Sequence, residues 1–596
     1  MTAQLVQEAL TAPTFVLVRR RLLRQLLESL LYEGVLRVRA GDAGDVIADG
    51  VDERDEPVQY VFQTWRRQGF DRVAVGPAPV RRLAGDEDRE AASVTRLLGE
   101  LRGALDTRPE QLERFAHELE ETLVKDAVAQ HVREQRGDVL AGAGYDALEA
   151  AIMDGHRYHP TYKSRVGFDV ADNLAFGPEF AAPLRPLWLA ARRSIAAVTL
   201  SSALREAPFL AEQLSVATLE DFAATIRAAG EDPAEFTLLP VHPWQWREKV
   251  ARAFAEPLAV RDLLVLGDDP HDFLAQQSIR TLTCVDAPRR PYLKLALSIV
   301  NTSTSRVLAP HTVHNAPLVS DWLARVVAGD WFLRDELRTV LLGEVMGSSV
   351  SPPAAAGLAR ADGYGSLACI WRESLHPRLD PDEQAVPFNG LTARERDGTP
   401  LVDGWVRALG LSAWVSYVVE VSAVPLLHLL CRHGIALEAH AQNMVLLHRD
   451  GVPTRVALKD FHDGVRFSRA QLAEPELCPE LAATPGHHQN RNSFLETDDL
   501  DLVADFLLDA FFFINIGELG IFLADAYDFP EHDFWAIVSQ TVAAYHGRFP
   551  ELAERFALFD VRKPTIAVEK LTTRRLLPDT ELRLHAVPNP LSEPPP

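Results

Sequence analysis

The sequence predicts an α+β protein built from more than one domain, and three observations support this class. The chain has 596 residues, more than one hydrophobic core usually supports, so roughly two to four domains are expected. Apolar residues recur with the period of a helix over 21–32 and 108–135. Alternation of apolar and polar residues over 292–299, and the two arms of the segment 436–464, instead predict paired antiparallel strands.

Composition and charge restrict the class of protein. Hydrophobic residues make up 47% of the chain and charged residues 24%, as in ordinary soluble globular proteins. The formal net charge of −23 leaves no basic excess to neutralise phosphates, which argues against nucleic acid or an anionic membrane as a partner. An anionic substrate therefore needs a local cationic pocket.

Cysteine usage and the apolar stretches favour a cytoplasmic location. The four cysteines are far apart and show no C-x-x-C spacing, so neither a zinc site nor a disulfide framework is indicated. No signal peptide is apparent at the N-terminus. The longest apolar stretches, 411–430 and 506–524, are interrupted by charged residues, so we expect buried helices there and no membrane span.

Residues 1–140 are predicted to be mainly helical and carry no evident chemistry. Short strands are expected at 35–38, 59–62 and 72–75. The charged run 85–90 is most simply a solvated loop that leads into a helix.

The next segment, 154–168, concentrates positive charge. Residues 156–165 include five cationic or protonatable side chains, and the neighbouring glycine and proline disfavour a helix. Arginine offers a carboxylate two parallel hydrogen bonds, lysine a compact charge and histidine a pH-dependent donor. The pattern is compatible with a carboxylate-binding loop and equally with a surface loop that pairs with acidic neighbours.

Polar side chains accumulate along the predicted central strands. A buried strand at 238–241 precedes His242, which we expect to be structural. Further along, hydroxyl and cationic residues form a donor set suited to a polyphosphate: Ser278, Arg280, Thr281, Lys294, Thr302 and Arg306. Because no Walker or dinucleotide-binding glycine motif is present, a phosphate site must be built from these side chains. Taken singly, each residue could equally lie on the polar outer face of an antiparallel sheet.

The segment 436–464 predicts a hairpin that gathers metal ligands. Strands at 444–447 and 456–458 are joined by a turn at 450–453. Closure of the hairpin brings its two ends together, and with them Glu438, His440, Asn443, Asp460 and Asp463. Hard oxygen ligands of this kind suit Mg²⁺, although Asn and Asp also cap ordinary turns. An Asn followed by an Asp-Phe pair is similar to kinase-type metal sites, which favours nucleotide binding.

With these motifs assembled, the chain resembles the IucA/IucC family, the NRPS-independent siderophore (NIS) synthetases. The matching segments are HRYHPTYKSRVGF at 156–168, HPWQ at 242–245, SIRT at 278–281, KLALSIVNTSTSR at 294–306, EAHAQN at 438–443 and KDFHDG at 459–464. Ala441 is a small departure, since glycine is more usual there in the family.

The resemblance implies a three-part open-hand architecture. An N-terminal thumb would span 1–140, a fingers domain with antiparallel sheet 141–346, and a kinase-like palm 347–596. The stretch 347–365, rich in Gly, Ser, Pro and Ala, is interpreted as a linker at the second boundary. ATP would lie between fingers and palm, and the family also implies a homodimer.

The resemblance further implies roles for individual residues. ATP would contact Ser278, Arg280, Thr281, Lys294, Thr302, Arg306, His440, Asn443 and Asp460, of which Lys294, Arg306 and His440 would be catalytic. Mg²⁺ would be held by Glu438, Asn443 and Asp460. The carboxylate substrate would be bound by His156, His159, Lys163 and Arg165.

The implied reaction is an ATP-dependent ligation. A polycarboxylate, most simply citrate, would attack the α-phosphate of ATP to give an acyl-adenylate, and an amine or hydroxyl would then displace AMP. A citrate or succinate monoamide, or 2-oxoglutarate, could replace citrate. The kinase-like Asn443 and Asp460 leave a small-molecule phosphotransferase as an alternative, and the cationic loop leaves a non-catalytic carboxylate or siderophore-binding protein.

Overall fold

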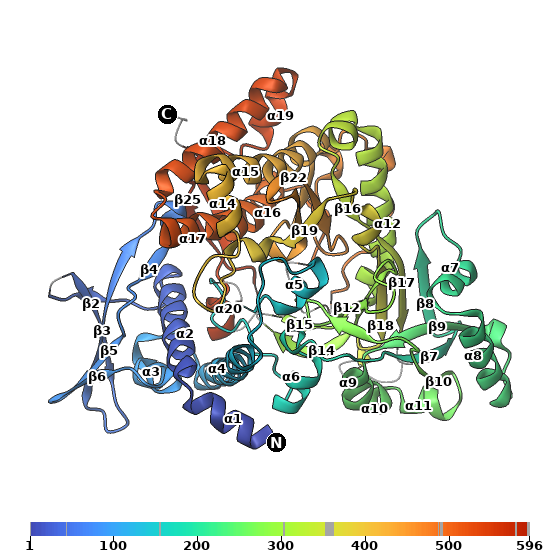
Figure 1. Ribbon diagram of the computed structural model, residues 1–596, viewed down its shortest axis with the longest axis horizontal. Helices are drawn as coiled ribbons and strands as arrows, with labels where there is room; N and C mark the ends of the chain where they lie inside the picture. Colours follow the sequence, from blue (N-terminus) through green and yellow to red (C-terminus); the bar gives the residue numbers. More distant parts are fainter. Residues whose placement is uncertain are drawn as a thin grey trace.

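The computed structural model describes residues 2–42, 44–153, 157–301, 304–351, 363–486, 488, 493–577 and 581–592. It contains helices and mainly antiparallel sheets, which confirms the predicted α+β class. In the view of Figure 1 the N-terminal region lies at the left, the central region at the right and the C-terminal helices at the top.

The N-terminal region pairs long helices with a sheet of short strands. Helices α1 (Thr2–Thr11), α2 (Pro13–Tyr32) and α4 (Pro109–Arg136) include the predicted helical segments. Proline begins α2 and α4, where the N–H that it lacks has no partner in a helix. The sheet has the order β1-β2-β3-β5-β6, with β4 on β3: β1 (Arg39–Ala40), β2 (Asp45–Val51), β3 (Pro57–Arg66), β4 (Val73–Val75), β5 (Arg81–Ala84) and β6 (Glu87–Glu90).

Two expectations for this sheet are wrong. Residues 35–38 are not a strand, because the chain there still follows the end of α2 and strand pairing begins only at β1. Residues 87–90, expected as a loop, form the edge strand β6. An edge strand made entirely of charged residues carries no apolar alternation, so the sequence pattern could not reveal it. The strands expected at 59–62 and 72–75 are confirmed as β3 and β4.

Two antiparallel sheets form the central region. The larger has the order β11-β12-β13-β18-β17-β8: β11 (Phe273–Ala275), β12 (Thr281–Cys284), β13 (Tyr292–Leu295), β18 (Ala368–Arg372), β17 (Glu344–Val350) and β8 (Ala196–Leu200). The smaller has the order β10-β7-β9: β10 (Leu263–Asp268), β7 (Leu187–Arg192) and β9 (Phe236–Val241). Two further strands, β14 (Leu297–Asn301) and β15 (Thr304–Arg306), pair with each other, so the run predicted over 292–299 is divided between two sheets.

The linker expected at 347–365 is wrong at its N-terminal end. Residues 347–350 are the end of β17, which pairs with β8 and with β18 and is buried. Small residues are needed there because a β-carbon on Gly347 would lie 2.2 Å from the Val313 carbonyl oxygen of α12 (Pro310–Gly329). Residues 352–362 lie outside the described part of the chain. The boundary expected after residue 346 falls inside this strand, and the three-domain division stays a prediction.

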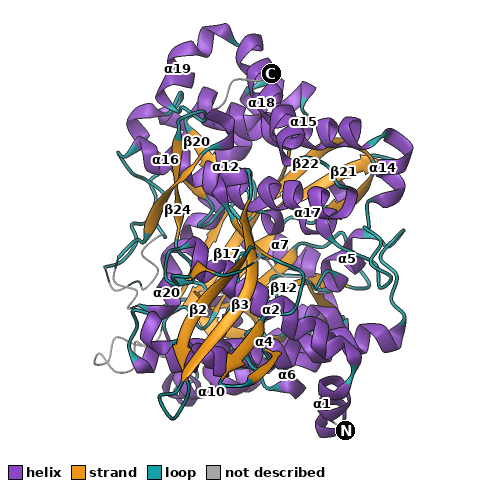
Figure 2. Cartoon of the chain, turned by 90° about the vertical axis from the view of Figure 1, so that its left-hand side faces the viewer, coloured by secondary structure: helices purple, strands orange, loops and turns teal. Residues whose placement is uncertain are grey.

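The hairpin predicted within 436–464 is confirmed. Strands β21 (Met444–Arg449) and β22 (Val452–Lys459) are antiparallel and joined by Asp450 and Gly451, both in the left-handed region, as a two-residue hairpin turn requires. They belong to a sheet of order β16-β22-β21-β19, with β16 (Val340–Leu342) and β19 (Gln384–Pro387). The hairpin packs against α15 (Leu411–His428), and in the view of Figure 2 it is drawn below α15 and above α17 (Gly517–Tyr527).

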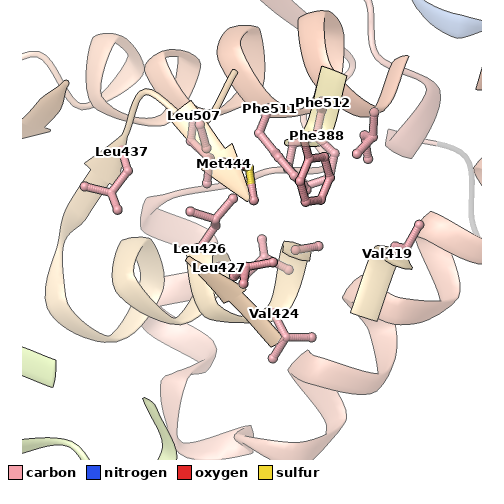
Figure 3. Packing of buried hydrophobic residues seen from close by; sticks show 14 of the residues in the cluster. Phe388, Val419, Val424, Leu426, Leu427, Leu437, Met444, Leu507, Phe511 and Phe512 are labelled. Carbon is pink, nitrogen blue, oxygen red and sulfur yellow. The ribbon is translucent and has the colours of Figure 1, made fainter. Parts of the chain in front are cut away.

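The two apolar stretches are core helices, as expected. Among the described residues, the segments Leu411–His433 and Leu500–Tyr527 are long and apolar enough to cross a membrane, and 72% and 78% of their apolar windows are buried inside the protein. The second joins α16 (Leu500–Leu507), the π-helical η13 (Leu508–Ile516) and α17. Figure 3 shows Leu427 of α15, Met444 of β21 and Phe511 of η13 packed in one cluster. This core supports the hairpin from behind.

Candidate active site

A cavity of about 420 Å³ lies where the strands β13 to β15 meet the segments at both ends of the hairpin. It gathers most of the residues that the sequence singled out: His159, Lys163, Arg165, Ser278, Arg280, Lys294, Arg306, Glu438, His440, Asn443 and Asp460. His156 and Thr302 lie outside the described residues. The predicted carboxylate, phosphate and metal residues therefore share one site, although they span 300 positions of the chain.

A tight loop before β12 presents Ser278 and Arg280 to the cavity. The N–H of Ile279 donates to the Gln276 carbonyl at 2.7 Å, and Ile279 adopts a φ of 71°, a strained conformation for a β-branched residue. Thr281 was expected to contact phosphate, but it is 1% exposed and its Oγ1 accepts a hydrogen bond from Ser278 Oγ at 2.7 Å. This hydrogen bond from Ser278 to Thr281 orients the Ser278 side chain.

Three cations line one end of the cavity in a largely dry environment. Lys294 comes from β13, opposite Thr281 of β12, and Arg306 ends β15. Arg280 Nη1 donates to the carbonyls of Arg306 and Val307 at 2.8 and 2.9 Å. Burial lowers the pKa of Lys294 and of Arg280, and lowers that of Arg306 to about 10. These charges would gain from a bound anion.

Asp460 links this cationic end to the hairpin. Its Oδ1 lies 2.8 Å from Lys294 Nζ and 2.8 Å from Arg372 Nη1. Although burial would raise the pKa of Asp460, Lys294 and Arg372 hold it well below its usual range. Asp460 has a φ of 69°, and a β-carbon at Gly464 would lie 2.3 Å from the Asp460 carbonyl oxygen. The turn after β22 therefore fixes the carboxylate between two cations and requires glycine four residues later.

Two residues that contact this turn, Glu344 and Arg372, were not predicted from the sequence. Glu344 of β17 is fully buried and accepts hydrogen bonds from His462 N at 2.8 Å and from His462 Nδ1 at 2.7 Å. One ligand atom from each of Glu344, Asp460 and His462 lies within 4.8 Å of the other two, so these three could hold a cation. The expected set paired Asp460 with Glu438 instead. No local motif marks Glu344 or Arg372, because both sit in buried strands far from the hairpin in sequence.

Carboxylates gather at the other end of the cavity. Glu438, Asp463, Asp509 and Glu569 all line it. Burial first, and then the charge of Asp463, raise the pKa of Glu438 to about 7. Burial and the charge of Glu569 raise the pKa of Asp509 well above its usual value. Arg574 Nη1 pairs with Glu569 Oε1 at 2.5 Å, so this end holds a paired carboxylate beside two acids whose protonated forms burial favours.

Two side chains of the EAHAQN segment have defined orientations. Asn443 Nδ2 donates to the Glu438 carbonyl at 2.9 Å, so its amide oxygen is the atom left to act as a ligand. His440 Nδ1 accepts from the Gln442 N–H at 3.2 Å, which places the proton of the neutral ring on Nε2. His440 can therefore present an N–H donor while Asn443 presents an oxygen.

The cationic segment reaches the cavity with its charges already paired. Both Nη atoms of Arg165 donate to the Glu179 carboxylate at 2.9 Å, and Lys163 Nζ lies 3.0 Å from Asp126 Oδ1 and 3.4 Å from Glu179 Oε1. Although burial would raise the pKa of Glu179, Arg165 and Lys163 lower it to about 2. The partners are buried acids, not the surface acids considered as the alternative. A role for Lys163 and Arg165 in binding substrate stays a prediction.

Comparisons with known proteins agree with these motifs. The IucA/IucC family matches residues 144–393, and a family described as ferric iron reductase FhuF-like transporter matches 412–584. A citryl-spermidine/3,4-dihydroxybenzoyl-citryl-spermidine:spermidine ligase of Bacillus anthracis is 39% identical over 98% of this chain and 95% of its own. A 2-[(L-alanin-3-ylcarbamoyl)methyl]-3-(2-aminoethylcarbamoyl)-2-hydroxypropanoate synthase of Staphylococcus aureus is 41% identical over 96% and 92%.

A solved structure shows the same fold over nearly the whole chain. The petrobactin biosynthesis protein AsbB of Bacillus anthracis superposes with a TM-score of 0.92 at 38% identity, covering 99% of this chain and 98% of that one. Likeness of this extent in both sequence and structure shows the family. The chain belongs to the IucA/IucC family, the siderophore synthetases.

Proposed function

We propose that this ligase of siderophore biosynthesis uses ATP to activate a carboxyl group of citrate, or of a citrate monoamide, and then joins it to an amine. The observation that carries the proposal is the charge distribution of the cavity. Buried cations occupy one end and buried acidic side chains the other. Such a site can hold two anions and a cation close together, which this ligation requires.

The cationic end serves the adenylation step. A citrate carboxylate oxygen forms a bond to the α-phosphorus of ATP, the bond to the bridging oxygen breaks, and pyrophosphate leaves. Arg280, Lys294 and Arg306 counter the repulsion between the two anions, and the carbonyl and Asp460 contacts hold Arg280 and Lys294 in place beforehand. The His440 Nε2–H is a further donor to a phosphate oxygen.

The residues at the hairpin fit Mg²⁺. Glu438, Asn443 and Asp460 offer hard oxygen ligands, and a divalent cation would stabilise the charged form of Glu438, which burial and then Asp463 disfavour. When bound, Mg²⁺ would stabilise charge on the phosphate oxygens. Asp463 lies three residues beyond Asp460 and would add its negative charge to the attraction for Mg²⁺. It accepts a hydrogen bond from Ser493 Oγ at 2.9 Å.

The acidic end serves the amine. A polyamine is cationic at neutral pH, and it would favour the charged forms of Glu438 and Asp509, whose pKa values burial raises. After one ammonium group loses a proton, its nitrogen forms a bond to the acyl carbon and the bond to AMP breaks. The spermidine named for the Bacillus anthracis relative has this chemistry. The nucleophile is therefore proposed to be an amine in preference to an alcohol.

The test is a product assay with a panel of carboxylates and amines. We expect AMP and pyrophosphate to appear only when a carboxylate is present, and an amide when spermidine or a diamine is added. Arg306→Met should lower kcat/KM by roughly 10²–10³-fold, by analogy with the loss of one preorganised donor. The matched control is Arg407→Met, because the Arg407 side chain is 78% exposed and remote from the charges above.

Two outcomes would refute the proposal. ADP as the sole nucleotide product would indicate a phosphotransferase. Tight citrate binding without ATP binding, measured by calorimetry, would indicate a non-catalytic binding protein. The open-hand arrangement with a kinase-like palm, and a homodimer, are retained as part of the proposal, and light scattering at micromolar concentration tests the dimer.

A further inference from the structure

A second cluster of ligand-type side chains lies away from the cavity. Asp330, His428 and His433 place one ligand atom each within 4.8 Å of one another, and none of the three lines the cavity. Asp330 Oδ2 is 3.0 Å from His428 Nε2 and 3.0 Å from His433 Nε2. All three side chains are shielded, with exposed fractions of 10%, 3% and 4%.

The helix geometry explains how the two histidines converge. His428 is the last residue of α15, and His433 ends the π-helical turn η9 (Leu429–His433) that continues it. In an α-helix, residues five apart point in different directions, but a π-helix closes hydrogen bonds from i to i+5, so residues five apart lie one turn above each other. The π-turn therefore aligns both Nε2 atoms with one carboxylate oxygen.

The remaining atom of each ligand is held by a partner of the right kind. His428 Nδ1 lies 3.0 Å from Tyr545 Oη, and His433 Nδ1 lies 3.3 Å from Glu474 Oε2. Asp330 Oδ1 accepts from the backbone N–H groups of Phe332 and Leu333 at 2.8 and 3.0 Å. Metal-binding histidines usually donate their second N–H to an oxygen in this way.

Glu474 distinguishes this cluster from an ordinary hydrogen-bonded core. A carboxylate only accepts, so His433 Nδ1 must donate to it, and in a neutral ring Nε2 then carries a lone pair. That lone pair faces the Asp330 oxygen, which also only accepts. Either a second ring proton or a metal cation between the two atoms removes the conflict. Ligands at right angles around an ion with bonds of about 2.1 Å lie about 3.0 Å apart, the spacing seen here, and a tetrahedral ion would widen that spacing to about 3.4 Å.

From this geometry we infer a structural site for a divalent transition-metal ion, held by Asp330, His428 and His433. Two imidazoles and one carboxylate select Zn²⁺, Co²⁺ or Fe²⁺ over Mg²⁺ and Ca²⁺, which prefer all-oxygen sites. The ion would join the end of α12 to the junction of α15 and η9. The rings of Phe332 and Phe549 flank the His428 ring, with centroid distances of 4.8 and 5.1 Å. The expected role is to stabilise this part of the fold.

The test uses tag-free full-length protein. We expect elemental analysis to find a single equivalent of a transition metal. Treatment with a chelator should remove this metal and lower the thermal midpoint. Addition of Zn²⁺, with nothing else added, should restore that midpoint. Co²⁺ should give visible d–d absorption. His433→Gln and Asp330→Asn should abolish the absorption, and Glu474→Gln should weaken Co²⁺ affinity by about 10- to 100-fold. His532→Gln, an exposed histidine beside Asp533, is the matched control and should change nothing.

The result that overturns the inference is equally specific. Folded wild-type protein that neither contains a transition metal nor takes up Zn²⁺ or Co²⁺ would show that the cluster is a protonated hydrogen-bond network. Co²⁺ absorption that persists in His433→Gln would place the ion elsewhere. Because the three residues do not line the cavity, citrate-dependent AMP release by the variants checks that they remain folded.

Discussion

The pair formed by Arg165 and Glu179 gives the sharpest test of how the cavity is built. Arg165→Met removes both hydrogen bonds to Glu179 and a third to Asn173, and it leaves the buried Glu179 carboxylate with Lys163 as its remaining cation. The fall in the Glu179 pKa from 4.5 to about 2 corresponds to about 3 kcal/mol. Removing one partner of a buried pair typically costs about 3–5 kcal/mol. We therefore expect a loss of stability of about 3 kcal/mol at pH 7.

Urea unfolding of a double-mutant cycle measures this loss. Arg165→Met, Glu179→Gln and the double variant should give a coupling energy of about 2–3 kcal/mol. Because the folded-state pKa of Glu179 is depressed, its contribution is present above about pH 4.5 and is lost as pH falls toward 2. Arg185→Met is the matched control, since Arg185 pairs with Asp272 at 2.7 Å on the surface and such pairs contribute at most about 1 kcal/mol.

The opposite result would refute this reasoning. If Arg165→Met unfolds at the parental urea concentration and raises the apparent KM for the carboxylate while that for ATP is unchanged, the arginine serves the substrate. The pairing with Glu179 would then be exchanged for substrate during turnover.

Three further predictions concern the hairpin. Asp460→Asn should abolish AMP release and also destabilise the fold by about 3–5 kcal/mol, since it leaves Lys294 and Arg372 unpaired; parental activity or stability would contradict this. Burial and Asp463 raise the pKa of Glu438 to about 7, so ionised Glu438 destabilises the fold increasingly as pH rises from 4.5 to 7. Glu438→Gln should therefore raise the thermal midpoint of the ligand-free protein at pH 8 but not at pH 5. Gly451→Ala should lower the thermal midpoint more than Gly398→Ala: both have a positive φ, but only at Gly451 would the β-carbon meet a ring, that of Trp405 at 2.2 Å.

Local patterns predicted the elements that position the site. Asp450-Gly451 between two apolar runs identified the hairpin, and alternation identified the strand that carries Lys294. His242 was expected to be structural, and it is fully buried with Nδ1 accepting from the Trp244 N–H at 3.1 Å. Each of these features depends on residues close together in sequence, where periodicity and turn chemistry are informative.

Long-range partners could not be predicted in the same way. Arg372 reaches Asp460 from 88 positions away, and Glu344 reaches His462 from 118. Both residues lie in interior strands whose sequences carry no functional motif. Only the order of strands in the sheet places them beside the turn. The pairing of Arg165 with Glu179 was missed for a different reason: the segment looked cationic because its acidic partners, Asp126 and Glu179, lie outside the motif on either side.

The balance of charge in the cavity also explains how an acidic protein can bind anionic substrates. With a net charge of −23, the whole molecule repels citrate and ATP at a distance. At physiological salt that repulsion decays over about 8 Å, whereas buried charges are screened much less. Lys294 is 2% exposed, and burial lowers the pKa values of Arg280 and Arg306. Dissolved salt therefore screens the attraction of these cations for a bound anion only weakly. Added salt should therefore weaken the long-range repulsion more than the binding contacts.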